Sequence, residues 1–193
     1  MALTSRFEEA LVYAARTHAG QKRKGTEIPY VSHLLIVAGI ALEHGAGEDE
    51  AIAALLHDAA EDQGGRARLE DIRARFGRRV AAIVGACSDT TETPKPPWRP
   101  RKEASIARVA GQMPSARLVS AADALANVRS LTAAHRKDGE AIWSRFKGGK
   151  EGTLWYYRSL ADALRSAGPS PLVDELDVAV GELEAMANFR DRP

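Results

Sequence analysis

The stretch ALLHDAAEDQ, residues 54–63, joins an apolar run to four polar side chains. It predicts a helix over about residues 49–62. On a helix each residue advances by about 100°, so four side chains fall on one arc of roughly 140°. These are His57, Asp58, Glu61 and Asp62, and the residues Ile52, Leu55, Leu56, Ala59 and Ala60 fill most of the opposite side.

This polar face is rich in groups that bind metals or transfer protons, whereas a solvated face more often mixes lysine, arginine and glutamine with glutamate. A His-Asp pair by itself often arises by chance, so a metal site needs further ligands elsewhere in the chain. His33 opens a second apolar helix, and Asp123 lies within the apolar run LVSAADALANV. A buried carboxylate needs a cation or hydrogen bonds. A capping histidine and a paired core aspartate are the alternative explanations.

The rest of the chain predicts an all-α fold, because helical apolar spacing recurs and no strand pattern is present. Glycine and proline mark the breaks between helices. The predicted helices cover about residues 7–18, 33–44, 49–62, 69–76, 80–86, 102–112, 115–132, 153–167 and 172–189. The proline-rich stretch 88–101 is predicted to be a surface connection or a flap, and residues 19–31 and 146–152 are predicted to be basic loops.

Length and composition favour one globular domain over residues 1–193. A net charge of +1 gives no reason to expect a nucleic-acid polymer or an anionic membrane as partner. The single cysteine, Cys87, excludes a disulfide framework and fits a reducing compartment. No stretch has the length of a membrane span and the first residues lack a signal-peptide core, so we expect a cytoplasmic location.

Four segments together resemble the HD-domain phosphohydrolases, and in particular the (p)ppGpp hydrolase domain of RelA/SpoT-type proteins. They are AARTHAGQKRKGTEIPYVSHLLIVAGI, AIAALLHDAAEDQ, FGRRVAAIVGACSDTTE and LVSAADALANVRSL. Their order and spacing match that domain over about residues 5–165. The resemblance implies a single HD-type helical bundle and the activity of a small alarmone hydrolase.

The resemblance implies a metal site formed by His33, His57, Asp58 and Asp123, which normally holds manganese. Mixed imidazole and carboxylate ligands suit Mn²⁺ or a similar divalent ion. Glu61 and Asp62 match the family's acidic pair. They are expected to orient or deprotonate a water that attacks the 3′-pyrophosphate, releasing GDP or GTP and pyrophosphate.

Such a substrate carries several negative charges, so cations must gather locally around it. The candidate substrate-binding residues are Arg23, Lys24, Asn127, Lys150 and Tyr157. Arg23 can stack on a purine or pair with a phosphate. Lys24 and Lys150 lie in the two basic loops, Asn127 follows Asp123 by one helical turn, and Tyr157 is a candidate for stacking on the base.

Two alternative functions and the oligomeric state stay open. The same chemistry could act on an adenosine alarmone such as (p)ppApp, on NADPH, or on another 3′- or 2′-phosphorylated nucleotide. A helical binding module with a decayed site is a second alternative, although all six proposed metal and acidic residues are present. The apolar final helix, residues 172–189, could pack on the core or on a second subunit, which leaves a homo-oligomer open.

Overall fold

The computed structural model describes residues 2–92 and 94–189, and over these residues it is helical. Extended pairing in this described part is limited to one isolated antiparallel bridge between Lys22 and Pro29. The helices are α1 (Ser5–Thr17), α2 (Val31–Glu43), α3 (Glu48–Leu56), α4 (Ala59–Asp62), α5 (Gly65–Phe76), α6 (Arg78–Cys87), α7 (Trp98–Arg108), α8 (Pro114–Asp138), α9 (Gly149–Ser166) and α10 (Pro171–Phe189), with 3-10 turns at Val109–Gly111 and Gly139–Arg145. The predicted all-α class is confirmed. Residues 190–193 of the predicted domain lie outside the described part.

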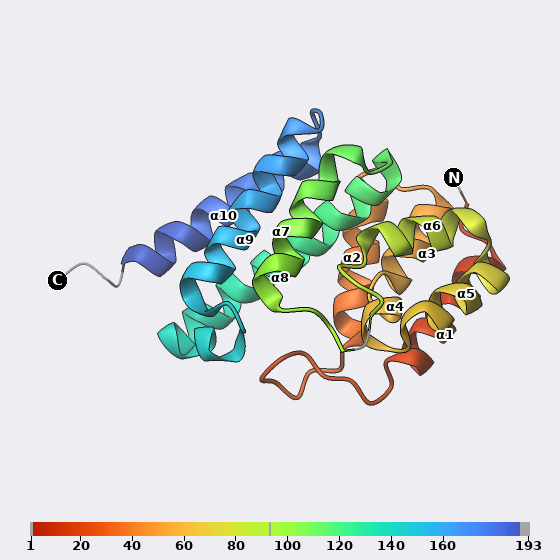
Figure 1. The fold of residues 1–193 in the computed structure, drawn as a ribbon, viewed down its shortest axis with the longest axis horizontal. Helices are drawn as coiled ribbons and strands as arrows, with labels where there is room; N and C mark the ends of the chain where they lie inside the picture. Colours follow the sequence, from red (N-terminus) through yellow and green to blue (C-terminus); the bar gives the residue numbers. More distant parts are fainter. Residues whose placement is uncertain (1, 93, 190–193) are drawn as a thin grey trace.

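Helix α8 is the central element of the fold. It packs against α2, α3 and α6 on one side and against α9 and α10 on the other. Figure 1 shows the two groups, with α1, α3, α5 and α6 toward the N-terminus and α9 beside α10 at the other end of the molecule. The apolar run before the His-Asp pair lies in the core, where Leu55 and Leu56 have no exposed surface. Burial of this run holds the His-Asp pair against α2 and α8.

The final helix packs on the core of its own chain, as one of the two predictions for it expects. Leu172, Leu176, Val180 and Leu183 of α10 have no exposed surface, and α10 lies against α8 and α9. Arg158 of α9 adds ion pairs to Asp177 and Glu184 of α10. The apolar face of α10 is therefore used inside the molecule.

Four predicted boundaries differ from the structure. The predicted helix over 49–62 is interrupted at His57 and Asp58, which separate α3 from α4. The predicted connection 88–101 ends early, because α7 already begins at Trp98. The indole of Trp98 lies so close to Gly148 that an added Cβ there would approach it to 2.6 Å. This contact between distant segments orders the first turn of α7.

The end of α8 and the start of α9 also differ from the sequence prediction. Helix α8 continues to Asp138 rather than ending near Thr132, and Gly139, at φ +62°, follows it. The basic loop over 146–152 is shortened, because α9 begins at Gly149. His135, which is buried, explains why α8 continues, since it packs against Trp143.

A polar contact joins α3, α6 and α8 on the surface away from the His-Asp pair. Glu50 Oε1 accepts hydrogen bonds from Ser115 Oγ at 2.6 Å and from Arg79 Nη2 at 2.7 Å. Burial raises the pKa of Glu50, but the hydrogen bonds from Ser115 and Arg79 outweigh it, and the pKa lies below its usual value. Glu50 is therefore ionised at neutral pH and stabilises the contact between these helices.

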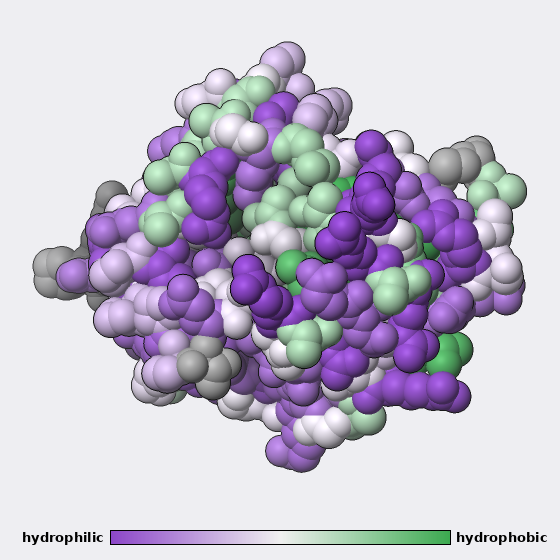
Figure 2. All heavy atoms as spheres, turned by 45° about the vertical axis from the view of Figure 1, so that its right-hand side comes forward, coloured by the Kyte–Doolittle hydropathy of each residue, from purple (hydrophilic) through white to green (hydrophobic). Residues whose placement is uncertain are grey.

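The face of the molecule drawn in Figure 2 is mostly hydrophilic, and its apolar side chains form small separate patches. Across the described ranges, no helix combines the length and hydropathy needed to cross a membrane.

Candidate metal centre and active site

The four predicted metal ligands come from three parts of the fold and meet in the interior. His33 lies in the first turn of α2, His57 and Asp58 lie between α3 and α4, and Asp123 lies in the middle of α8. His33 Nε2 is 3.1 Å from Asp123 Oδ1 and 3.7 Å from Asp58 Oδ2. His57 Nε2 is 3.0 Å from Asp58 Oδ2 and 3.5 Å from Asp123 Oδ1. The structure therefore brings all four side chains to one place.

The break between α3 and α4 orients the ring of His57. Its Nδ1 bonds to the carbonyl oxygen of Ala54 at 2.8 Å. In a continuous helix that carbonyl would accept the backbone N–H of Asp58. With the proton on Nδ1, the lone pair is on Nε2, which faces the carboxylates. This arrangement of a histidine, with one nitrogen bound to a carbonyl and the other free for a ligand, is usual in metal sites.

The donor set fits a divalent cation. Within the described part of the chain, the buried Nε2 atoms of His33 and His57 make no hydrogen bond of good geometry. One ligand atom from each of His33, His57 and Asp58 lies within 4.8 Å of the others, a spacing that could hold a metal ion. Two imidazoles and carboxylate oxygens suit a borderline or hard divalent ion. A cation between them would satisfy both nitrogens.

The electrostatics of the site favour positive charge at its centre. Burial raises the pKa values of Asp58 and Asp123, but the neighbouring histidines outweigh it and hold both pKa values well below their usual range. Burial lowers the pKa of His57, but the two carboxylates outweigh it and raise that pKa well above its usual value. Both carboxylates are therefore ionised at neutral pH, as metal ligands must be.

Tyr30 supports Asp58 from the other side. Its hydroxyl donates a hydrogen bond to Asp58 Oδ2 at 2.5 Å. The Tyr30 ring stacks on the buried ring of His18, with centroids 5.2 Å apart, and meets the ring of His33 edge-on at 5.5 Å. Burial and the Asp58 carboxylate raise the pKa of Tyr30, so its hydroxyl keeps its proton for this bond. Tyr30 therefore restricts the rotation of a candidate metal ligand.

The acidic pair faces the segment that follows α6. Lys95 Nζ is 3.1 Å from Glu61 Oε1 and 2.9 Å from Asp62 Oδ1. Asp62 Oδ2 also accepts a hydrogen bond from Gln21 at 2.9 Å. Burial and the nearby Asp89 carboxylate raise the pKa of Glu61, and Lys95 opposes them. A carboxyl group with a raised pKa is suited to accept and return a proton near neutral pH.

Arg23 and Asn127 connect the first basic loop to the metal centre. Arg23 Nη2 donates to Asn127 Oδ1 at 2.8 Å, and Asn127 Nδ2 donates to Asp123 Oδ1 at 2.7 Å. The guanidinium of Arg23 also lies over the ring of Tyr30, 5.8 Å from its centroid. Two predicted substrate-binding residues thus lie beside the candidate ligand Asp123.

The other three predicted substrate-binding residues lie farther along the molecule. Lys24 Nζ lies over the ring of Phe146, and burial and the charges of Lys147 and Lys102 lower its pKa. Tyr157 packs against Tyr156, with ring centroids 5.0 Å apart. Lys150 Nζ is 2.8 Å from the carbonyl oxygen of Ala187 and 3.2 Å from Glu140 Oε2, on the side of α10.

Several residues in contact with the site were not singled out from the sequence: Tyr30, His18, Gln21, Asp89, Lys95, Arg101 and Lys102. Tyr30 and Gln21 belong to the segment that carries the family resemblance, so the motif itself was the available signal. Lys95 and Arg101 lie in the proline-rich stretch, where nothing in the sequence indicates which acid a base will meet. Only the folded chain brings them to Glu61 and Asp62.

Comparison with known proteins agrees with this arrangement. Residues 10–154 match the HD domain family model. Guanosine-3′,5′-bis(diphosphate) 3′-pyrophosphohydrolase MESH1 of Drosophila melanogaster is 34% identical over 152 residues, covering 74% of this chain and 82% of that protein. The human MESH1 is 36% identical over 127 residues, covering 64% and 68% of the two chains.

Solved structures give the same result. A metazoan orthologue of SpoT, described as hydrolysing ppGpp and acting in starvation responses, superposes with a TM-score of 0.77 at 29% identity, over 93% of this chain and 96% of that one. A protein of Listeria monocytogenes EGD-e superposes with a TM-score of 0.67 at 33% identity, over 77% of this chain and 96% of that one. The chain therefore belongs to the HD domain family of hydrolases.

Proposed function

We propose that this protein is a manganese-dependent hydrolase of the 3′-pyrophosphate of guanosine alarmones, converting (p)ppGpp to GDP or GTP and pyrophosphate. The observation that carries the proposal is the convergence of two buried imidazole nitrogens with two ionised carboxylates, directly beside a second acidic pair. The relatives that are named as 3′-pyrophosphohydrolases of guanosine-3′,5′-bis(diphosphate) support the choice of substrate.

His33, His57, Asp58 and Asp123 would hold the cation. A divalent cation at this position supplies Lewis acidity, which lowers the pKa of a water and stabilises negative charge on phosphate oxygens. Glu61 takes the proton from the attacking water, because its raised pKa is suited to proton transfer. Asp62, which is held by Lys95 and Gln21, orients the same water.

Cations of the chain bind and orient the polyanionic substrate. Arg23 and Lys24 lie on the first basic loop. Burial lowers the pKa of Lys24, and the charges of Lys147 and Lys102 lower it further, so these lysines share one region of positive potential. An anion placed among them relieves the repulsion between like charges. Asn127 donates a hydrogen bond to ribose or phosphate, and Tyr157 contacts the base. The expected location remains the cytoplasm.

The test is pyrophosphate release from ppGpp and from ppApp, measured with Mn²⁺ and with a chelator. Wild type is compared with Asp58→Ala and with Asp162→Asn, an exposed carboxylate on α9 that serves as the matched control. We expect Mn²⁺-dependent release from ppGpp in wild type and in the control. Asp58→Ala should lose more than about a hundredfold of the rate, because residues that merely support metal ligands already contribute about 10- to 100-fold.

Two outcomes would contradict the proposal. Faster release from ppApp than from ppGpp would support the proposed reaction but show that adenine, rather than guanine, is the preferred base. Absence of release from both nucleotides, in a protein that binds Mn²⁺ by calorimetry, would overturn the substrate class, and NADPH and 3′-phosphorylated nucleotides would be assayed next.

A further inference from the structure

A buried arginine from α7 bridges the acidic pair to a third carboxylate. The Arg101 side chain is only 10% exposed, and its Nη1 is 2.8 Å from Glu61 Oε1 and 2.9 Å from Asp89 Oδ2. Asp89 is 6% exposed, and its Oδ2 is also 2.5 Å from Lys102 Nζ. Charges this deeply buried are costly unless they are paired and hydrogen-bonded. The buried Arg101 therefore depends on its ion pairs with Glu61 and Asp89.

Glu61 is held at both of its carboxylate oxygens. Arg101 donates to Oε1, and the backbone N–H of Asp89 donates to Oε2 at 3.0 Å. Two donors that come from different elements fix the position of the carboxylate and the plane of its oxygens. Lys95 also reaches Oε1, but its side chain is 37% exposed and extends from the proline-rich connection. Arg101 is the better-buried of the two cationic partners.

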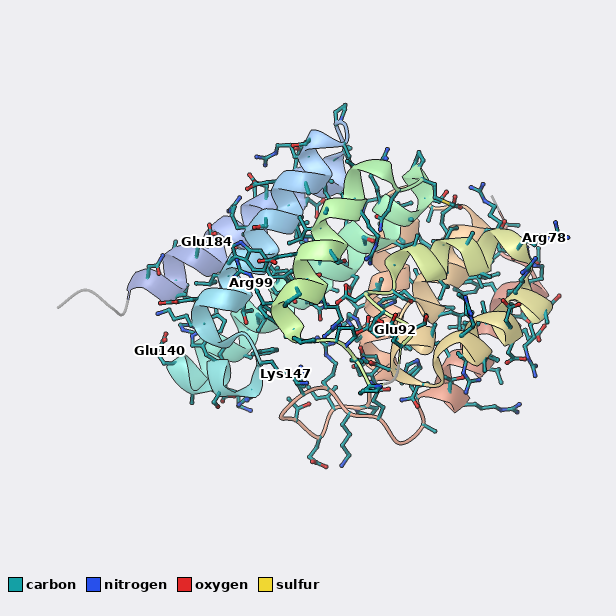
Figure 3. The ribbon with its side chains drawn as sticks, in the orientation of Figure 1. Arg78, Glu92, Arg99, Glu140, Lys147 and Glu184 are labelled. Carbon is teal, nitrogen blue, oxygen red and sulfur yellow. The ribbon has the colours of Figure 1, made fainter. Side chains whose placement is uncertain are left out.

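Arg101 is carried on an anchored helix. Trp98, one turn earlier on α7, packs so tightly on α9 that a Cβ at Gly152 would lie 3.2 Å from its indole. The guanidinium of Arg99 stacks on Trp155 of α9, 3.3 Å from the ring centroid. Figure 3 shows Arg99 between α7 and α9. Trp98 keeps the start of α7, and with it Arg101, in a fixed place, whereas Arg99, whose side chain is 51% exposed, adds little to this anchor.

The charges of this cluster balance. The carboxylates of Glu61, Asp62 and Asp89 face the cations Lys95, Arg101 and Lys102. Removal of one cation leaves an excess negative charge beside the candidate metal centre. One nitrogen of Arg101, Nη1, contacts both carboxylates. Arginine suits such a buried bridge because its guanidinium stays charged and is more weakly hydrated than an ammonium group.

We propose that Arg101 is a positioning residue for the hydrolytic reaction, which holds the Glu61 carboxylate in place and is itself held by Asp89. The inference rests on the proposed function for the role of Glu61. Arg101 does not contact the substrate in this proposal. It acts through Glu61, so its loss should lower kcat and leave KM largely unchanged.

The first measurement is steady-state kinetics of pyrophosphate release from ppGpp with Mn²⁺. The variants are Arg101→Gln, Arg101→Lys and Asp89→Asn, with Arg99→Gln as the control on the same helix. We expect Arg101→Gln to lower kcat by up to about a hundredfold, because a misplacement of about 1 Å at a reacting group can cost that much. KM should change less than about threefold. Arg101→Lys should recover part of kcat, Asp89→Asn should lower kcat less than Arg101→Gln, and Arg99→Gln should match wild type.

The second measurement is a crystal structure of each variant soaked with Mn²⁺. We expect the Glu61 carboxylate to leave its place in Arg101→Gln and to keep it in Arg99→Gln. This readout needs no substrate, so it tests the inference even when wild type hydrolyses none of the nucleotides. In that case the proposed function fails, while a displaced Glu61 still supports the positioning role.

The inference is wrong when Glu61 keeps its place in Arg101→Gln, or when that variant retains the wild-type kcat. An increase in KM at constant kcat would also overturn it, because it would indicate direct substrate binding by Arg101. When Arg101→Gln fails to fold, Arg101→Lys and Asp89→Asn decide: wild-type kcat in both variants refutes the proposal, and reduced kcat at unchanged KM supports it.

Discussion

Replacement of Tyr30 by phenylalanine is expected to weaken metal binding without disturbing the fold. The change removes one hydroxyl, which donates to Asp58 Oδ2 at 2.5 Å. The ring contacts with His18 and His33 depend on the aromatic ring, and phenylalanine keeps them. Asp58 would then be free to rotate away from the point where His33 and His57 face it.

The size of the effect follows from the bond that is lost. A hydrogen bond to a charged acceptor contributes about 1.5–3 kcal/mol, and loss of a residue that supports a metal ligand weakens metal binding by about 10- to 100-fold. The side chain of Asp58 is 22% exposed, so water can replace part of the lost bond. We therefore expect the lower end of this range, a Kd for Mn²⁺ raised about tenfold, or about 1.4 kcal/mol.

The assay is isothermal titration of the chelator-treated protein with Mn²⁺. Tyr13→Phe is the matched control, because the Tyr13 hydroxyl also donates to a carboxylate, that of Asp71 at 2.6 Å, on the surface near α5. A Kd for Tyr30→Phe within twofold of wild type would refute the reasoning, as would an equal loss in Tyr13→Phe. Chemical denaturation of each variant establishes that the protein is folded.

Three further predictions concern stability and reactivity. Glu50→Gln should lower the free energy of unfolding by about 1 kcal/mol at pH 7. Because the folded-state pKa of Glu50 lies below its usual value, this contribution is present above about pH 4.3 and is lost as the pH falls through the folded-state pKa, so the difference from wild type in denaturation should shrink on acidification. Burial raises the pKa of the Cys87 thiol to about 11, so only about one molecule in a thousand carries the thiolate at pH 8. A thiol reagent should therefore react slowly with the native protein and fast with the unfolded protein. Fast reaction of the native protein would contradict this. Gly148→Ala places a Cβ 2.6 Å from the Trp98 indole and should lower the free energy of unfolding by about 1–3 kcal/mol. Gly181→Ala, with nothing within 4 Å, should leave the stability unchanged or raise it. Equal effects of the two changes would argue against tight packing of Trp98 on Gly148.

The helix boundaries were predictable where a helix-breaking glycine coincides with the end of the apolar spacing. Gly45 and Gly47 mark the break between α2 and α3, and Gly77 ends α5 as expected. The break at His57 was not predictable, because it depends on a side chain that takes the carbonyl of Ala54 from the backbone. The start of α7 at Trp98 depends on a contact with α9, fifty residues away in the sequence.

The site also has a part that was predictable from the sequence and a part that depends on tertiary contacts. His33, His57, Asp58 and Asp123 were candidates because each stands out against an apolar run, and the family resemblance implied that they form one metal site. The structure brings them together. The bases that meet Glu61 and Asp62 were not named, because charged residues in a proline-rich stretch look like ordinary solvated surface. Their partners follow only from how α7 docks on α9.

The hydrogen-bonded chain from Arg23 through Asn127 to Asp123 has a thermodynamic consequence. One end lies on the basic loop, and the other end is a candidate ligand of the cation. A substrate that draws Arg23 away from Asn127 changes the restraint on Asp123, and a cation that draws on Asp123 changes the restraint on Arg23. Linkage requires the two effects to be equal in free energy. Under the proposed function, the affinity for the cation would therefore depend on whether the nucleotide is bound, and the affinity for the nucleotide would depend on the cation by the same factor.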